Sequence, residues 1–269
     1  MKTIWRKLLP WLLILLSGCA EGRTVLESEA TAAMMRGDFA RSIPLWNQVL
    51  AKDPKNADAY RDRATAKVAV EDLPGALADY NESLAYAPRV GTTYLYRGAV
   101  WEAMGRWDDA IVDYNRVLQL EPRADDALNN RGHAYGGKGQ WATAIQDFQS
   151  ALILNPRSDI ARLNLALAFI ETDQPKRALE VYAKASQQER TFADFQAAQA
   201  VALWESKRPK EAVVLMRKAL KQDPRYGNRQ WLRELRRWPP KVVAKTLAME
   251  QALQLKPPSP PGGAFTKGL

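Results

Sequence analysis

Cysteine and histidine, which often act in catalysis and metal binding, each occur once in this sequence, as Cys19 and His133. A single cysteine excludes an internal disulfide, and one cysteine with one histidine is too few for the usual thiolate and imidazole metal sites. The acidic pairs at 108–109 and 125–126 stand near expected helix starts, where carboxylates cap a helix and favour its dipole. No glycine-rich phosphate loop, nucleophile elbow or zinc motif occurs in the sequence. We therefore predict that the chain is not an enzyme and uses no metal or cofactor.

Arginine and aspartate recur together at a fixed spacing. Arg63, Arg97 and Arg131 are 34 residues apart, and an aspartate follows each of them after 16 residues. These aspartates are Asp79, Asp113 and Asp147. Because a buried guanidinium needs a carboxylate partner, we predict three ion pairs, each joining two helices of one structural unit. The alternative is that the six side chains are independent charges in solvent.

The elements that must position these pairs repeat with the same period. Residues 91–122 and 125–156 align without a gap at a shift of 34. The alignment places Tyr94 on Leu128, Gly98 on Gly132, Trp101 on Tyr135, Gly105 on Gly139, Ala110 on Ala144, Tyr114 on Phe148 and Pro122 on Pro156. This order of small, aromatic and proline positions resembles the tetratricopeptide-repeat (TPR) family. The resemblance implies an all-α, right-handed α-solenoid of helix-turn-helix units that holds other proteins.

Extended in both directions, this frame predicts six repeats over residues 23–224, because a helix hairpin buries its apolar face only by stacking on its neighbours. The repeats begin at Arg23, Ala57, Gly91, Asp125, Asp159 and Ala193. Gly37, Gly105 and Gly139 mark turns between paired helices, and Pro175 and Pro209 stand where second helices begin. After the repeats we expect capping helices over 225–255, with Trp231, Leu235 and Trp238 on one stripe, and a disordered tail rich in Pro and Gly over 256–269.

The N-terminal segment has the pattern of an export signal. Residues 1–18 hold three basic residues, a short apolar run and small residues before Cys19. The segment Leu16–Cys19, Leu-Ser-Gly-Cys, resembles the bacterial lipobox, which implies that the Cys19 sulfur is lipidated and that the chain is anchored to a bilayer. Residues 19–22 would be the lipidated cysteine and a short linker, and Ala20 favours the outer membrane over the inner one. The alternative is an ordinary signal with a coincidental cysteine.

The family resemblance also places a concave groove along the first helices of the repeats. By repeat position, we predict that the groove is lined by Arg61, Leu95, Asn129, Asn130, His133, Leu163, Leu167 and Trp204. A polar centre with an apolar C-terminal side suits an envelope protein's peptide or helix. The alternative is a wetted channel that binds nothing.

The C-terminal end is strongly basic. Residues 207–245 hold 13 Lys and Arg against three acidic residues, whereas the whole chain has a net charge of +9. We predict an anion-binding surface formed by Arg229, Arg233, Arg236, Arg237, Lys241 and Lys245. Acidic lipid, anionic glycan or an acidic protein patch would fit this charge, and nucleic acid fits the charge but not an exported protein.

Together these features predict a membrane-anchored lipoprotein that faces the periplasm of a bacterial envelope and acts as a scaffold or adaptor. Family members with this layout include pilotins for pilus secretins and adaptors for peptidoglycan hydrolases. Two alternatives stay open: a structural subunit of an export or secretion machine, and a glycan binder that uses the basic end.

Overall fold

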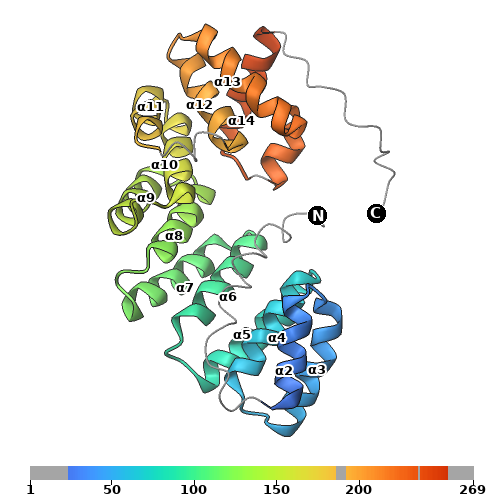
Figure 1. Cartoon of the computed structure of the whole chain (residues 1–269). Coiled ribbons are helices and arrows are strands. Elements are labelled where there is room, and N and C mark those ends of the chain that lie inside the picture. The colour runs from blue at the N-terminus through green and yellow to red at the C-terminus, as the bar shows by residue number, and fades with distance from the viewer. Residues whose placement is uncertain (1–23, 186–191, 236, 254–269) are drawn as a thin grey trace. The chain divides into compact units, whose positions relative to one another are not determined.

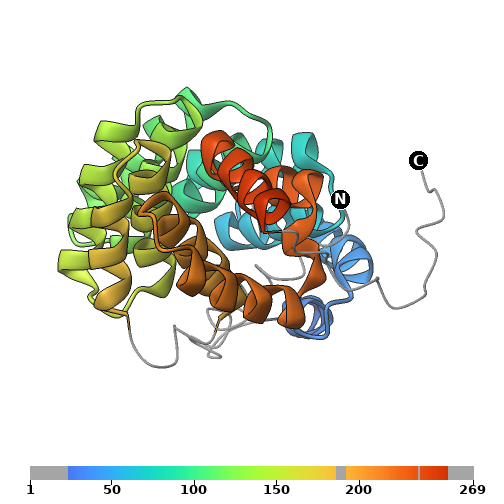
Figure 2. The ribbon, with the colours of Figure 1, turned by 90° about the horizontal axis from the view of Figure 1, so that it is seen from above.

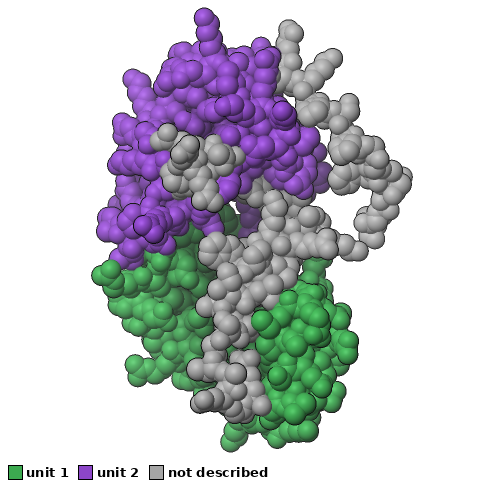
Figure 3. All heavy atoms as spheres, viewed as in Figure 1, with its two compact units in different colours: residues 1–138 green, residues 139–269 purple. Residues whose placement is uncertain are grey.

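The computed structural model describes residues 24–185, 192–235 and 237–253, and the regular elements in these ranges are helices (Figure 1). The prediction of an all-α fold of paired helices is confirmed. The predicted signal, lipidation site, linker and C-terminal tail (1–18, 19–22 and 256–269) lie outside the described residues. In the described ranges, no helix combines the length and the apolar character needed to cross a bilayer. The chain divides into two compact units, residues 1–138 and 139–269 (Figure 3).

The first unit consists of helices that each pack on the next. They are α2 (Val25–Met35), α3 (Phe39–Lys52), α4 (Ala57–Ala69), α5 (Leu73–Tyr86), α6 (Gly91–Ala103), α7 (Trp107–Leu120) and α8 (Asp125–Gly137). Three of the predicted repeat starts, Ala57, Gly91 and Asp125, are the first residues of α4, α6 and α8. These first helices also contact one another in order, so that side chains from successive repeats share one face.

The second unit begins with the same pattern and ends differently. Its helices are α9 (Trp141–Leu154), α10 (Asp159–Glu171), α11 (Pro175–Ala183), α12 (Ala193–Glu205), α13 (Pro209–Gln222), the short turns η3 (Pro224–Gly227) and η4 (Trp231–Leu235), and α14 (Pro240–Ala252). α9 to α13 pack in chain order, and α10 also contacts α12. η3 packs on α13 and so covers the last repeat, whereas α14 packs on the first helices α10 and α12 (red in Figure 2).

Each turn between paired helices passes through a residue with a left-handed backbone. Gly37, Gly105 and Gly139 have φ of 76°, 72° and 75°, at the positions predicted from their type. The same repeat position is occupied by Glu71, Asp173 and Lys207, with φ of 68°, 58° and 61°. The sequence did not indicate a left-handed backbone at these three residues, because glycine is the residue type that adopts this conformation readily.

Small residues on one helix of a repeat allow a large side chain of the other to approach closely. Gly98 on α6 is buried against Tyr114 on α7, which is itself 0% exposed. A Cβ built on Gly98 would lie 2.6 Å from the nearest atom of that ring, closer than real Cβ atoms come. The equivalent large residues are all buried in the described repeats: Trp46, Tyr80, Phe148, Tyr182 and Met216.

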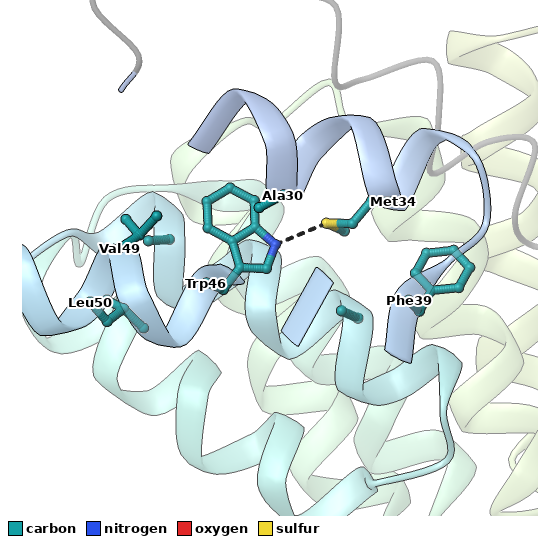
Figure 4. Close-up of a cluster of buried hydrophobic side chains, with 8 residues drawn as sticks. Ala30, Met34, Phe39, Trp46, Val49 and Leu50 are labelled. Carbon is teal, nitrogen blue, oxygen red and sulfur yellow. Dashed lines mark hydrogen bonds between the residues drawn. The ribbon is translucent and has the colours of Figure 1, made fainter. Parts of the chain in front are cut away.

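The first repeat shows how this packing begins. Trp46 of α3 lies over Ala30 of α2, and its indole Nε1–H points at Met34 Sδ, with an N–S distance of 3.2 Å (Figure 4). Val49 and Leu50 belong to the same buried cluster, which therefore spans both helices of the hairpin.

Two of the three predicted arginine–aspartate pairs are present in the first unit. Arg63 donates to Asp79 through Nε and Nη2, at 2.8 and 2.6 Å. Arg97 donates to Asp113 in the same way, at 2.9 and 2.6 Å. Each pair joins α4 to α5 or α6 to α7, and the aspartates are 3% and 1% exposed. Arg131 belongs to the first unit and Asp147 to the second, and their pairing stays a prediction.

Each of these arginines also reaches back to the preceding repeat. Their Nη1 atoms donate to the side-chain oxygens of asparagines on α3, α5 and α7, each at 2.7 Å. The asparagines are Asn47, Asn81 and Asn115. Arg63 and Arg97 therefore each tie together three helices. The sequence carries a signal for these contacts, since the asparagines are also 34 residues apart.

We predict that Arg97→Leu destabilises the first unit by about 3 kcal/mol, because it leaves Asp113 without its charged partner. Burial raises the pKa of Asp113, and the hydrogen bond and charge of Arg97 act in the opposite direction. The double variant Arg97→Leu with Asp113→Leu should recover most of the loss, since both charges are then gone. Urea unfolding of the three proteins measures the difference, and a double variant as unstable as Arg97→Leu would contradict the pairing.

Candidate protein-binding faces

The first unit presents a polar face on α4, α6 and α8. All of the groove residues predicted in this unit are half-buried: Arg61, Leu95, Asn129, Asn130 and His133. Leu95 packs against the buried cluster formed by α7 and α8, and the Asn129 amide donates to Asn130 at 3.2 Å. The face therefore offers amide, imidazole and guanidinium groups on an apolar base.

Three carboxylates hold the charged side chains of this face in place. Arg61 donates to Asp58 at 2.5 Å and to Asp62 at 3.2 Å. Glu102 is 8% exposed, accepts from the Tyr114 hydroxyl at 3.1 Å and lies 2.9 Å from Nδ1 of His133.

Sequence reasoning missed Asp62 and Glu102. The positions equivalent to Glu102 in the neighbouring repeats hold Val68 and Gly136, so no repeat pattern singles it out. His133 lies between Glu102 and the ring of Trp107, whose centroid is 6.2 Å away. This arrangement fixes the imidazole as a hydrogen-bonding group of the face. The described residues contain no cluster of three His, Cys, Asp or Glu side chains suited to a metal ion.

The second unit has an apolar face instead, on α10 and α12. Leu163 and Trp204, predicted to line the groove, are half-buried, whereas Leu167 is 5% exposed and the equivalent Val201 is 0% exposed. α14 covers this face. Leu167 is therefore buried on a face that a helix of the same chain covers, and its role as a groove residue stays a prediction.

α14 buries one stripe of its side chains against the rest of the second unit. Its buried residues are Val242, Val243, Thr246, Met249 and Glu250. The spacing i, i+4, i+7 is that of an amphipathic helix seated in a groove. Capping helices over 225–255 were predicted, but the position of α14 on α10 and α12 was not.

Acidic side chains at the ends of α10 and α12 bind the first turn of α14. Glu171 accepts the backbone N–H of Val242 at 3.1 Å. Lys245 contacts both Asp173 and Glu205, at 2.6 and 3.0 Å. The hydrogen bond from Lys245, with a second from Lys241 at 3.0 Å, lowers the pKa of Asp173 to about 2.

These contacts involve two residues of the predicted anion-binding surface. Lys241 and Lys245 lie in ion pairs within the chain. Arg229 and Arg233 are exposed, Arg237 is half-buried, and Arg236 lies outside the described residues. Lys241 is exposed beside its partner Asp173, whereas Lys245 is half-buried, and the anion-binding surface stays a prediction.

The tryptophans predicted as one helical stripe gather around a tyrosine. Trp231 and Trp238 lie with ring centroids 5.0 and 5.8 Å from that of Tyr226, which is 2% exposed. The Tyr226 hydroxyl donates to Asp194 on α12. This small cluster fixes the chain between α13 and α14 and so determines where α14 begins.

We predict that Glu250→Gln stabilises the second unit at pH 8, by about 1–2 kcal/mol. Burial raises the pKa of Glu250 to about 7, and its Oε1 has no hydrogen-bond partner among the described residues. Since the folded-state pKa lies above the ordinary value of 4.5, wild-type stability falls as pH rises from about 4.5 to about 7. Urea unfolding should show the two proteins converging below that range.

The exposed Glu180→Gln on α11 is the control, because it removes one carboxylate without changing the buried stripe. An advantage of Glu250→Gln that is equal at pH 4 and pH 8 would refute the assignment of a buried ionisable group.

Comparison with known proteins agrees with this architecture. Models described as tetratricopeptide repeat match residues 28–66 and 137–202, and one described as TPR repeat matches 103–139. No curated protein sequence matches the chain.

Several solved structures share the fold. PilF of Pseudomonas aeruginosa is 17% identical, with a TM-score of 0.65 over 85% of this chain and 96% of PilF. A MamA protein is 24% identical, with a TM-score of 0.55 over 64% of this chain and 94% of MamA. YrrB, described as a TPR protein with an unusual peptide-binding site, is 21% identical, with a TM-score of 0.53 over 66% of this chain and 92% of YrrB. At these identities the likeness shows the fold alone. Together with the paired helices and the repeat matches, it shows that the chain is a tetratricopeptide-repeat protein.

Proposed function

We propose that this chain is a lipid-anchored scaffold that holds proteins of the bacterial envelope at a membrane surface, facing the periplasm, with the outer membrane favoured over the inner. Proteins of the TPR family are typically non-catalytic and bind protein partners in their grooves. The observation that carries the proposal is the polar face of α4, α6 and α8, whose side chains are held in place by Asp62 and Glu102. The Leu-Ser-Gly-Cys segment ending at Cys19 supports the anchor.

Binding and tethering together would be the mechanism. Preorganised donors on the first unit, Arg61, Asn129 and Asn130, would orient a partner segment by hydrogen bonds, and the apolar base beside Leu95 would give contact area. Only residues 20–22 separate Cys19 from the first predicted repeat, so the scaffold would stay close to the membrane. Confinement to one surface raises the effective concentration of partners on that surface. Recruitment of this kind is what a pilotin-like or hydrolase-adaptor-like lipoprotein would do.

A direct glycan binder that uses the basic end has less support. Lys241 and Lys245 are engaged by Asp173, so an anionic polymer would have to compete with an existing ion pair. Arg229 and Arg233 remain exposed and could contribute contacts to an acidic partner.

We predict that Cys19→Ala releases the protein from the membrane fraction, because the acyl chains have no other acceptor. Ser17→Ala is the matched control, since a small residue two positions before the cysteine is retained, and this variant should stay membrane-bound. Fractionation of cells that express each variant measures the effect. If Cys19→Ala sediments with the membranes as the wild type does, the anchor is wrong.

We also predict that a photo-crosslinking residue at Asn129 captures one dominant envelope protein in living cells. A probe at Val112, 66% exposed on the second helix α7, is the control and should capture no such protein. Mass spectrometry of the adducts identifies the partner. Equal adducts from both positions would count against binding through the polar face, and capture only from a probe at Arg233 would move the site to the basic end.

A further inference from the structure

The face of α10 and α12 carries the features of a helix-binding groove, and it is already occupied. α14 contacts both of these first helices and turns Val242, Thr246 and Met249 toward the fold. In the repeat frame, Leu167 and Val201 stand on this face, at the position that His133 has in the polar face of the first unit. The occupant is thus seated where a tetratricopeptide repeat presents its binding surface.

Polar contacts at one end of α14 fix its direction. α14 begins with Pro239-Pro240 and has no side-chain cap of its own. Glu171, the last residue of α10, takes the place of that cap by accepting the backbone N–H of Val242. A carboxylate at a helix N-terminus also interacts favourably with the helix dipole. This contact is therefore made by the receptor helix rather than by the helix that is bound.

The charges match across the contact. Glu171 and Glu205 occupy the same repeat position, 34 residues apart, and Asp173 stands in the turn after α10. Lys241 and Lys245 of α14 lie against this acidic edge. The surface therefore suits a helix that has apolar residues at i, i+4 and i+7 and basic residues in its first turns.

We propose that α10 and α12 form a binding surface for an amphipathic helix with a basic N-terminal turn, that α14 is its resident ligand, and that a partner binds by replacing α14 with a helix of the same kind. The replacement by a partner depends on the scaffold function proposed above. Because α14 is joined to α13 through residues 223–239, its contact with the surface is intramolecular, so a free helix competes only when α14 is weakened.

The test uses a fluorescent peptide with the sequence of residues 239–253 and the purified full chain. In the variant Lys241→Glu with Lys245→Glu, two carboxylates face Glu171, Asp173 and Glu205, so α14 should leave the surface. Anisotropy should then show the wild-type peptide binding at least tenfold more tightly to this variant than to the wild-type protein. A peptide with the same two reversals should not bind.

Lys210→Glu with Lys218→Glu is the matched control, since both lysines are exposed on α13 and the change in net charge is the same. It should bind the peptide no better than the wild type. Hydrogen exchange on the same proteins reports whether the α14 amides lose protection. A second full-chain variant, Met249→Asp, places a carboxylate in the buried stripe and serves as an independent means of release.

Two outcomes overturn the proposal. If α14 keeps its protection in both variants, the helix is a permanent part of the fold. If α14 is released and the peptide still does not bind, the surface is not a helix receptor. Neither result involves an envelope partner, so failure of the crosslinking experiment at Asn129 and failure of this one are separate findings.

Discussion

The close approach of paired helices is the constraint on which each unit depends. A small residue on one helix lets a large ring of the other fill the space between them, as Gly98 does for Tyr114. The sequence must therefore return to a small residue at fixed intervals, and the left-handed turn must bring the second helix back at the same angle each time. Where Glu71 or Lys207 occupies that turn, packing of the hairpin imposes a backbone that the residue type does not favour.

Once this approach is set, the arginines of the middle repeats can act between repeats as well as within them. Arg97 lies where Asp113 of its own repeat and Asn81 of the preceding one both come within hydrogen-bond distance. A buried ion pair adds little net stability, since both charges lose their water. Its value here is positional, because a guanidinium with fixed partners in three helices allows one arrangement of the polar face.

Much of the fold follows from residue types in the sequence, and less of the site does. Periodicity placed the helices, and the arginine–aspartate spacing indicated contacts 16 residues apart. Glu102 could not be found in this way, because its partner His133 is 31 residues away and its repeat position is otherwise filled by Val68 and Gly136. The position of α14 depends on contacts such as Lys245 with Asp173, 72 residues apart, for which no local pattern exists.

The difference between the two faces explains why one can stand open while the other is covered. On α4, α6 and α8 the polar groups have partners within the face, so exposure to water costs little. On α10 and α12 the equivalent positions hold Leu167 and Val201, and an exposed apolar stripe of this kind would favour association with other surfaces. A tethered helix solves this problem, since it covers the stripe, and the exchange proposed above would not leave the stripe in water. If both proposals hold, the polar face would serve for first contact with a partner, and the apolar face for contact that requires the release of α14.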